Sequence, residues 1–157
     1  MVTNGVKLVP SGVYSHAIDE KGRVAIPAKI RESLQRDGHD RIVITNAYYD
    51  SSPCLHICTP HEWDSFIQKL KTKNRFDHKL QRFEFFYVGN AHEVQVDKQG
   101  RILIPQRLRE HARLERDVTF VTMSDKLQAW NTNTYEEVSK SVNEEAKKPE
   151  FYQDLDV

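Results

Sequence analysis

The residues of this sequence that could recognise a ligand form one short pattern that occurs twice. Asp19-Glu-Lys-Gly-Arg23 precedes the apolar run Val24-Ala-Ile-Pro27, and the pattern returns at an offset of 78 residues as Asp97-Lys-Gln-Gly-Arg101-Ile-Leu-Ile-Pro105. Each arginine carries a guanidinium fork that can donate two parallel hydrogen bonds to a carboxylate, a phosphate or a guanine edge. Lys21 and Lys98 add a second positive charge to each copy. The chain therefore carries a duplicated module.

The order of residues in each copy predicts a tight hairpin turn. Its aspartate can bond the backbone two residues further on, and its glycine can take the positive φ that closes a short hairpin with a bulge. The arginine then stands at the tip, and after a short apolar strand the proline opens a helix at its first position. The residues given these structural roles are Asp19, Gly22 and Pro27 in the first copy and Asp97, Gly100 and Pro105 in the second.

Two interpretations of the turn arginines stand side by side. Each arginine can form a salt bridge with the aspartate of its own turn, which on a surface contributes only about 0–1 kcal/mol. Alternatively, a turn-tip arginine can form the fork that reads guanine through O6 and N7. The two are compatible, because the aspartate of Arg23 or Arg101 can orient the guanidinium until DNA arrives.

Hydrophobic periodicity places the remaining elements of each module. The first helix ends at Asp37-Gly38, and strands at 41–45 and 54–58 flank a loop at 48–53. In the second copy, strands at 118–121 and 127–130 flank a shorter loop at 124–126, which changes the repeat offset to 72 residues.

Helices are predicted to end the modules. Thr59-Pro-His-Glu62 is a capping box that begins a helix with an apolar side, and its counterpart begins after Asn131. A further helix over 76–87, after a break at 72–74, makes the connection a packed helical hairpin. Its aromatic residues could stack on bases, but their helical spacing favours a core or subunit interface. They are Phe76, Phe83, Phe85, Phe86 and Tyr87.

Charge is balanced overall but unevenly distributed. The 157 residues hold 23 basic and 23 acidic side chains, so the net charge is zero, without the overall basicity usual for nucleic-acid binders. Residues 69–82 contain six cations and one acid, whereas the charged residues of 136–156 are mostly acidic. This asymmetry can leave a basic surface on a neutral protein. We expect residues 1–11 to be a mobile or partner-docked arm and the tail after Pro149 to be disordered.

No pattern in the sequence indicates catalysis, a cofactor or a resident metal. There is no nucleophile with its base, no phosphate-cradling glycine loop and no recurring histidine. Cys54 and Cys58, with His56 and His61, could hold a metal, but half-buried residues on a hairpin are the simpler interpretation. We therefore expect no enzyme, no metal site, no small-molecule substrate and no membrane partner. The two cysteines and the absence of a targeting or apolar spanning segment predict a cytoplasmic location.

The doubled Asp-x-x-Gly-Arg turn with its following proline resembles the SpoVT-AbrB family of DNA-binding proteins. The resemblance covers roughly residues 13–142. It implies an α/β protein of mixed α+β type, with two swapped-hairpin barrel modules in a pseudo-two-fold arrangement and helices at the module ends. The expected units are module 1 at 13–62, a helical connection at 63–90, module 2 at 91–134, and a C-terminal helix with an acidic tail at 135–157.

The resemblance also implies a function. Two-motif members of that family regulate bacterial division and cell-wall gene clusters, and their turn arginine is implicated in DNA contact, which corresponds here to Arg23 and Arg101. It predicts a nucleoid-associated repressor of its own operon that binds repeated promoter boxes in double-stranded DNA as a ring-like homo-oligomer. Lys21 and Lys98 are expected to add phosphate contacts. The alternative is a protein-interaction module, antitoxin-like or a structural ring, without specific DNA recognition.

Overall fold

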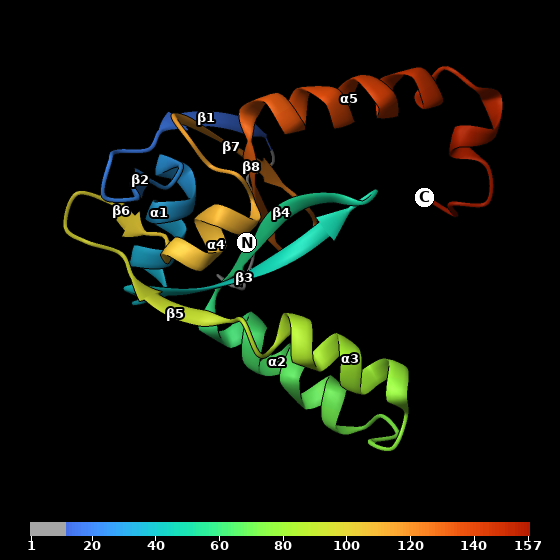
Figure 1. Ribbon diagram of the computed structural model, residues 1–157, viewed down its shortest axis with the longest axis horizontal. Coiled ribbons are helices and arrows are strands. Elements are labelled where there is room, and N and C mark those ends of the chain that lie inside the picture. Colours follow the sequence, from blue (N-terminus) through green and yellow to red (C-terminus); the bar gives the residue numbers. More distant parts are fainter. Residues whose placement is uncertain (1–11) are drawn as a thin grey trace.

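The computed structural model describes residues 12–157 as a mixed α+β protein with an antiparallel sheet and five α-helices (Figure 1). The predicted arm at residues 1–11 lies outside the described residues. In chain order the elements are β1 (Val13–Ala17), β2 (Arg23–Ala25), α1 (Ala28–Arg36), β3 (Arg41–Tyr49), β4 (Ser52–Cys58), α2 (Pro60–Lys71), α3 (His78–Tyr87), β5 (His92–Gln95), β6 (Arg101–Leu103), α4 (Gln106–His111), β7 (Asp117–Thr122), β8 (Leu127–Asn131), α5 (Thr132–Ala146) and the 3₁₀ helix η1 (Pro149–Tyr152).

The strands of the two sequence copies pair with each other. The six-stranded sheet has the order β1-β7-β8-β4-β3-β5, so the first strand of each copy lies against the hairpin of the other copy. Tyr14 of β1 faces Phe120 of β7, and Val94 of β5 faces Ile42 of β3. The two short strands β2 and β6 form a separate antiparallel ribbon. Each copy therefore supplies strands that the other copy needs.

The main core lies between one face of the sheet, the ribbon, and helices α1 and α4. Ribbon residues Val24 and Ile102 are almost fully buried there, as are Leu34 of α1 and Leu108 of α4. Burying one such aliphatic side chain contributes about 1.5–3 kcal/mol. The contributions from the two copies match pairwise, so a single shared core holds both modules together.

The other face of the sheet carries α2, α3 and α5. The predicted capping box begins α2: the Thr59 side chain accepts a hydrogen bond from the Glu62 backbone, and the Glu62 carboxylate accepts one from the Thr59 backbone. The last residue of α3 is anchored to the sheet, because the Tyr87 hydroxyl is hydrogen-bonded to His56 Nδ1 at 2.7 Å. Figure 1 shows the α2–α3 hairpin and α5 extending along opposite sides of the β3–β4 hairpin.

Several details differ from the sequence-based expectations. The predicted loop at 48–53 is wrong, because the ladder continues through Tyr48↔Pro53 and Tyr49↔Ser52. Only Asp50 and Ser51 turn, both with positive φ, as a two-residue hairpin requires. The tail is not wholly without structure, since residues 149–152 form η1.

The two module prolines also sit one position earlier than predicted. Pro27 and Pro105 are N-caps rather than first helical residues, with ψ of 135° and 143°. Only their carbonyl groups join the helix: the Pro27 oxygen accepts from the backbone N–H of Ile30 and Arg31. Each proline still belongs to the preceding extended segment, which accounts for its ψ.

The aromatic residues of the connection divide into three groups. Phe86 packs against Tyr48 of β3 and His111 of α4. Phe83 and Tyr87 pack with Trp63 and Phe66 of α2. Phe76 and Phe85, in contrast, are 91% and 86% exposed, so a core interpretation is wrong for these two residues.

We expect Gly22→Ala and Gly100→Ala to destabilise the protein by about 2–3 kcal/mol. Both glycines have positive φ, 90° and 79°, and a Cβ at either position would overlap the guanidinium group of Arg109 or Arg31. Gly38→Ala is the matched control, because Gly38 has a φ of 75° but no atom within 4 Å of its would-be Cβ. The free energy of unfolding of Gly38→Ala should fall only by the cost of backbone strain at a positive φ, about 1–2 kcal/mol. Urea unfolding measures all three, and equal losses would show that the arginine contacts contribute nothing.

We also expect acid to destabilise the packing of α3 through His56. Burial, assisted by the nearby Lys126 charge, lowers the pKa of His56 to about 4 from the usual 6.5. Between these values the unfolded chain binds the proton and the folded chain does not, so the free energy of unfolding falls as pH falls. The loss from this group approaches about 3 kcal/mol at pH 4.

Urea unfolding of wild type and His56→Gln between pH 7 and pH 4 tests this expectation. The variant should lose the part of the pH dependence that His56 supplies. His92→Gln, at an exposed histidine, serves as the control. A pH dependence that is identical in wild type and His56→Gln would contradict the prediction.

Candidate nucleic-acid interface

The first turn is built around the carboxylate of Asp19. One oxygen, Oδ1, accepts hydrogen bonds from the backbone N–H groups of Lys21 at 2.9 Å and Arg23 at 2.8 Å. The backbone of Asp19 also exchanges hydrogen bonds with Gly22 and Arg23. The predicted role of aspartate as the turn-forming residue therefore has a direct geometric basis.

The second turn repeats this arrangement bond for bond. Asp97 Oδ1 accepts from the backbone N–H groups of Gln99 at 2.8 Å and Arg101 at 2.9 Å. The backbone bonds from Gly100 to Asp97 and from Asp97 to Arg101 are also present. Two copies separated by 78 residues thus fold into the same local structure.

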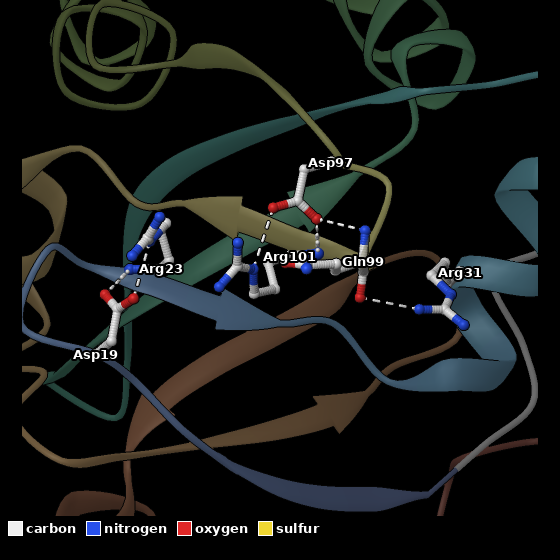
Figure 2. A network of polar contacts seen from close by, with 6 residues as sticks. All are labelled: Asp19, Arg23, Arg31, Asp97, Gln99 and Arg101. Carbon is white, nitrogen blue, oxygen red and sulfur yellow. Dashed lines mark hydrogen bonds and ion pairs between the residues drawn. The ribbon is translucent and has the colours of Figure 1, made fainter.

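The second carboxylate oxygen of each aspartate holds the arginine side chain (Figure 2). Arg23 Nε donates to Asp19 Oδ2 at 2.8 Å, and Arg101 Nε donates to Asp97 Oδ2 at 3.1 Å. The arginine side chains are 37% and 35% exposed. Within residues 12–157, no hydrogen bond engages Nη1 or Nη2 of either arginine. Each guanidinium is therefore oriented through its Nε edge, while the two Nη groups remain able to donate.

The carboxylates of these pairs stay ionised at neutral pH. The pKa of Asp19 is lowered mainly by the backbone N–H of Arg23, with the Arg23 side chain adding to the effect and desolvation opposing it. The pKa of Asp97 is lowered in the same way by Arg101. An ionised carboxylate accepts all of these hydrogen bonds, so the turn keeps its geometry across the physiological range.

The tertiary structure brings the two arginines onto one surface. In the β2–β6 ribbon, Arg23 faces Leu103 and Ala25 faces Arg101, while Val24 and Ile102 point into the core. Successive strand residues alternate between faces, so both arginines and Leu103 share the outward face. The Cα atoms of Arg23 and Arg101 form a diagonal pair across the ribbon. The distance between the Cα atoms of such a pair is typically about 7–8 Å. This ribbon face, Arg23, Ala25, Arg101 and Leu103, is the candidate site.

The two lysines lie at opposite ends of the ribbon. Lys21 belongs to the turn before β2 and Lys98 to the turn before β6, and both are exposed. Because β2 and β6 are antiparallel, the two turns flank the ribbon face from its two ends. The order of the predicted cationic residues along the ribbon is therefore Lys21, Arg23, Arg101 and Lys98.

Sequence reasoning missed two residues that support the turns. Arg31 of α1 donates from Nη1 to the Gln99 carbonyl at 3.0 Å, as Figure 2 shows, so a helix of one copy braces the turn of the other. Arg109 of α4 lies over Gly22 and donates from Nε to the Ile104 carbonyl at 3.0 Å. Their matching positions at the 78-residue offset were the available signal.

The other sequence-based candidate, the cysteine and histidine group of β4, has no matching metal geometry. Among residues 12–157 no cluster of three or more histidine, cysteine, aspartate or glutamate side chains is arranged to hold a metal ion. Burial raises the pKa of both Cys54 and Cys58 to about 12, so these thiols stay protonated and unreactive. In the same part of the chain, no helix combines the length and apolarity needed to cross a membrane.

Comparison with known proteins connects this geometry to a family. The model of a family described as "MraZ protein, putative antitoxin-like" matches twice, over residues 10–86 and 87–155. A curated relative from Caldanaerobacter subterraneus subsp. tengcongensis, named "Transcriptional regulator MraZ", is 42% identical over 132 residues, covering 84% of this chain and 87% of the relative. A relative of the same name from Acetivibrio thermocellus is 38% identical, covering 87% and 90%.

A solved structure adds little to these sequence relationships. The solution structure of PHS018 from Pyrococcus horikoshii aligns over 74% of this chain and 84% of that one, at 15% identity and a TM-score of 0.32. A score this low does not bear on the fold. The two family matches together span almost the whole chain, and the relatives align across both sequence copies. The chain therefore belongs to the MraZ protein family.

Proposed function

We propose that this protein is a transcriptional regulator that binds specific double-stranded DNA through the β2–β6 ribbon. The observation that carries the proposal is the pair of aspartate-braced arginines, Arg23 and Arg101, on one exposed ribbon face. A two-stranded ribbon fits the major groove, and an arginine fork there donates to O6 and N7 of guanine. The diagonal spacing of about 7–8 Å corresponds to roughly two base-pair steps of 3.4 Å.

The lysines supply a different kind of contact. Lys21 and Lys98 flank the ribbon at its two ends, where the phosphate backbones border the groove. Lysine acts there as a point charge that releases counterions and carries no base information. The lysines thus position the protein on the DNA, and the arginines read the bases.

The cellular role proposed here follows the relatives, which are named as transcriptional regulators. Together with the resemblance to two-motif SpoVT-AbrB proteins, this supports a repressor of its own division and cell-wall operon, acting on the nucleoid in the cytoplasm. The exchanged strands support two swapped-hairpin modules at 13–62 and 91–134, a helical connection at 63–90 and a C-terminal unit at 135–157. A resident cofactor plays no part in this mechanism.

Affinity must come from several protomers acting together. At the β2–β6 ribbon and its two turns each protomer presents the two predicted arginines and two lysines, and Asp19 and Asp97 partly neutralise the arginines. A ring-like homo-oligomer that repeats the ribbon around its edge can engage several DNA boxes at once. Linking binding events in this way raises avidity by about 10²–10⁴ without new contacts.

A protein-interaction role without specific DNA recognition is the second candidate. The family description "putative antitoxin-like" favours it, as does the zero net charge of the chain. In that case the aspartate–arginine pairs only hold the turns. The two functions differ in their dependence on base sequence and on salt, which the following experiments measure.

Replacement of Arg23 or Arg101 by alanine should weaken binding to a specific box by about 1–3 kcal/mol and relax base preference at one position. Arg23→Lys and Arg101→Lys are matched variants that keep the charge but lose the fork. They should keep the salt dependence and lose the base preference. Fluorescence polarisation at two salt concentrations, on boxes selected from a random-sequence library, measures both quantities.

Lys21→Ala and Lys98→Ala serve as controls that remove a proposed phosphate contact and leave the proposed base-reading arginines in place. Each should weaken specific and random duplexes alike and reduce the salt slope by about 0.9. Thermal melting checks that all variants fold. Arginine variants that keep wild-type base preference would refute the assignment of base reading to the ribbon.

Specific binding should require more than one box. We expect duplexes with two or three boxes in helical phase to bind at least about 10²-fold more tightly than a duplex with one box. Moving one box by half a helical turn should remove most of that gain. Affinities are measured alongside the mass in solution by light scattering, and equal affinity for one and three boxes would exclude the multivalent mechanism.

A further inference from the structure

The two copies differ in what covers their last helix. Helix α2 ends the first module and α5 ends the second, and both begin after a side-chain N-cap, Thr59 and Asn131. At the offset of 72 residues their apolar sides correspond pairwise, as Trp63/Tyr135, Phe66/Val138 and Leu70/Val142. The first module therefore shows what the apolar side of such a helix packs against.

In the first module, α3 covers part of that apolar side, and a pocket of about 500 Å³ remains beside it, lined by residues that include Trp63, Phe66, Phe83 and Tyr87. The ring of Tyr87 stacks on Trp63, with centroids 5.8 Å apart, and also contacts Phe66 at 5.5 Å. Phe83 contacts Phe66 at 6.1 Å. An aromatic helix is thus the natural partner of this surface in the first copy.

In the second module, no helix of residues 12–157 takes the place of α3, because α5 is followed by η1. A groove of about 200 Å³ remains between α5 and the sheet. Its walls are mainly apolar, with the polar side chains of Ser139 and Asn143 on the α5 side and Gln128 on the sheet side. The apolar residues include Val121, Met123, Trp130, Val138 and Val142. This α5 groove is large enough for an aromatic ring, since benzene fits a cavity of about 150 Å³.

The chain also exposes aromatic rings that lack a place in its own core. Phe85 lies on the free side of α3, the side opposite Tyr87, and Phe76 lies at the tip of the α2–α3 hairpin. Arg82 is three residues before Phe85 and shares its side of the helix. The free face of α3, His78, Arg82 and Phe85, is therefore aromatic and basic.

The charges of the two surfaces are complementary. The α2–α3 hairpin is basic, with six cations and one acid in residues 69–82. By helical spacing, Glu136 and Glu145 flank the apolar side of α5 that borders the groove. A basic aromatic face and an acid-flanked apolar groove attract each other, whereas two copies of either surface repel.

We propose that the free face of α3 of one copy packs into the α5 groove of a second copy, with Phe85 seated in the groove. The contact is head-to-tail, so every protomer offers one donor and one acceptor surface, and repetition closes into a ring. The α5 groove thereby receives its aromatic helix from a second copy, whereas α2 packs against the aromatic helix α3 of its own chain. This inference rests on the self-assembly in the proposed function, and it names the surfaces that produce it.

Two substitutions test the donor and acceptor separately. Phe85→Asp places a charge at an 86% exposed position, and Asn143→Arg places a cation at an exposed position of the groove, where it repels the incoming basic helix. Each variant of the full chain should fall from the wild-type assembly to the mass of one chain by light scattering. The matched controls Phe85→Leu and Asn143→Asp should keep the wild-type mass, and thermal melting should show all four folded.

A mixture of the two defective variants gives the most specific result. Phe85→Asp retains an intact α5 groove and Asn143→Arg retains an intact α3 face, so an equimolar mixture should form dimers of two chains and stop there. Assembly of the mixture to wild-type size would overturn the proposal. So would wild-type mass in both single variants, or a wild-type chain that stays single, since the groove would then hold another segment or a different protein.

DNA binding separates this inference from the proposed function. Phe85→Asp should keep the affinity for one isolated box and lose the gain from several boxes. If it loses one-box affinity at unchanged mass, Phe85 stacks on nucleic acid and the protein–protein contact is wrong. If Arg23→Ala and Arg101→Ala leave base preference intact while Phe85→Asp still dissociates the assembly, the interface stands and the DNA assignment fails.

Discussion

The structure depends on the backbone hydrogen bonds that the two sequence copies exchange around the β2–β6 ribbon. The N–H of Ile26 donates to the Gly100 carbonyl, and the N–H of Ile104 donates to the Gly22 carbonyl, each at about 3 Å. The turn of each copy is thereby clamped by the strand of the other. A 60-residue unit buries too little surface to be robust alone, so this exchange turns two marginal modules into one fold.

The hydrogen bonds within each turn explain how a weak ion pair can still position the arginine side chain well. An exposed aspartate–arginine pair contributes only about 0–1 kcal/mol. At Asp19 and Asp97, however, the carboxylate is already fixed by two backbone N–H groups, so the arginine meets a preorganised acceptor. Because the pair itself is weak and only Nε is engaged, a ligand at the Nη groups needs little rearrangement of the turn.

The two sequence copies are equivalent on the core face of the sheet but not on its other face. On the core face, α1 and α4 match, and the ribbon lies between equivalent neighbours. On the other face, α3 follows α2, but only η1 follows α5. This broken symmetry leaves an aromatic helix face and an apolar groove on the same chain. A duplicated protein can in this way acquire a directional contact that two identical modules would lack.

The sequence by itself determined the features that local contacts create. The Asp-x-x-Gly-Arg turns and the capping box at Thr59 were predictable, because their hydrogen bonds join residues two to four positions apart. The two helices of the connection were predictable from the helical spacing of their apolar residues. The positions of most strands followed from periodicity as well. The two-residue turn at Asp50 and Ser51 was missed, since neighbouring serine and proline suggested a longer loop.

Only the tertiary structure decided which strands pair and which side chains share a surface. Nothing in the local pattern specifies that β1 lies against β7, that Arg23 and Arg101 occupy one ribbon face, or that Arg31 braces a turn 68 residues away. These contacts join residues that are distant in the sequence, and their geometry is set by burial of a core common to both copies. Periodicity shows which side of a strand is apolar, but it does not show which distant strand covers it.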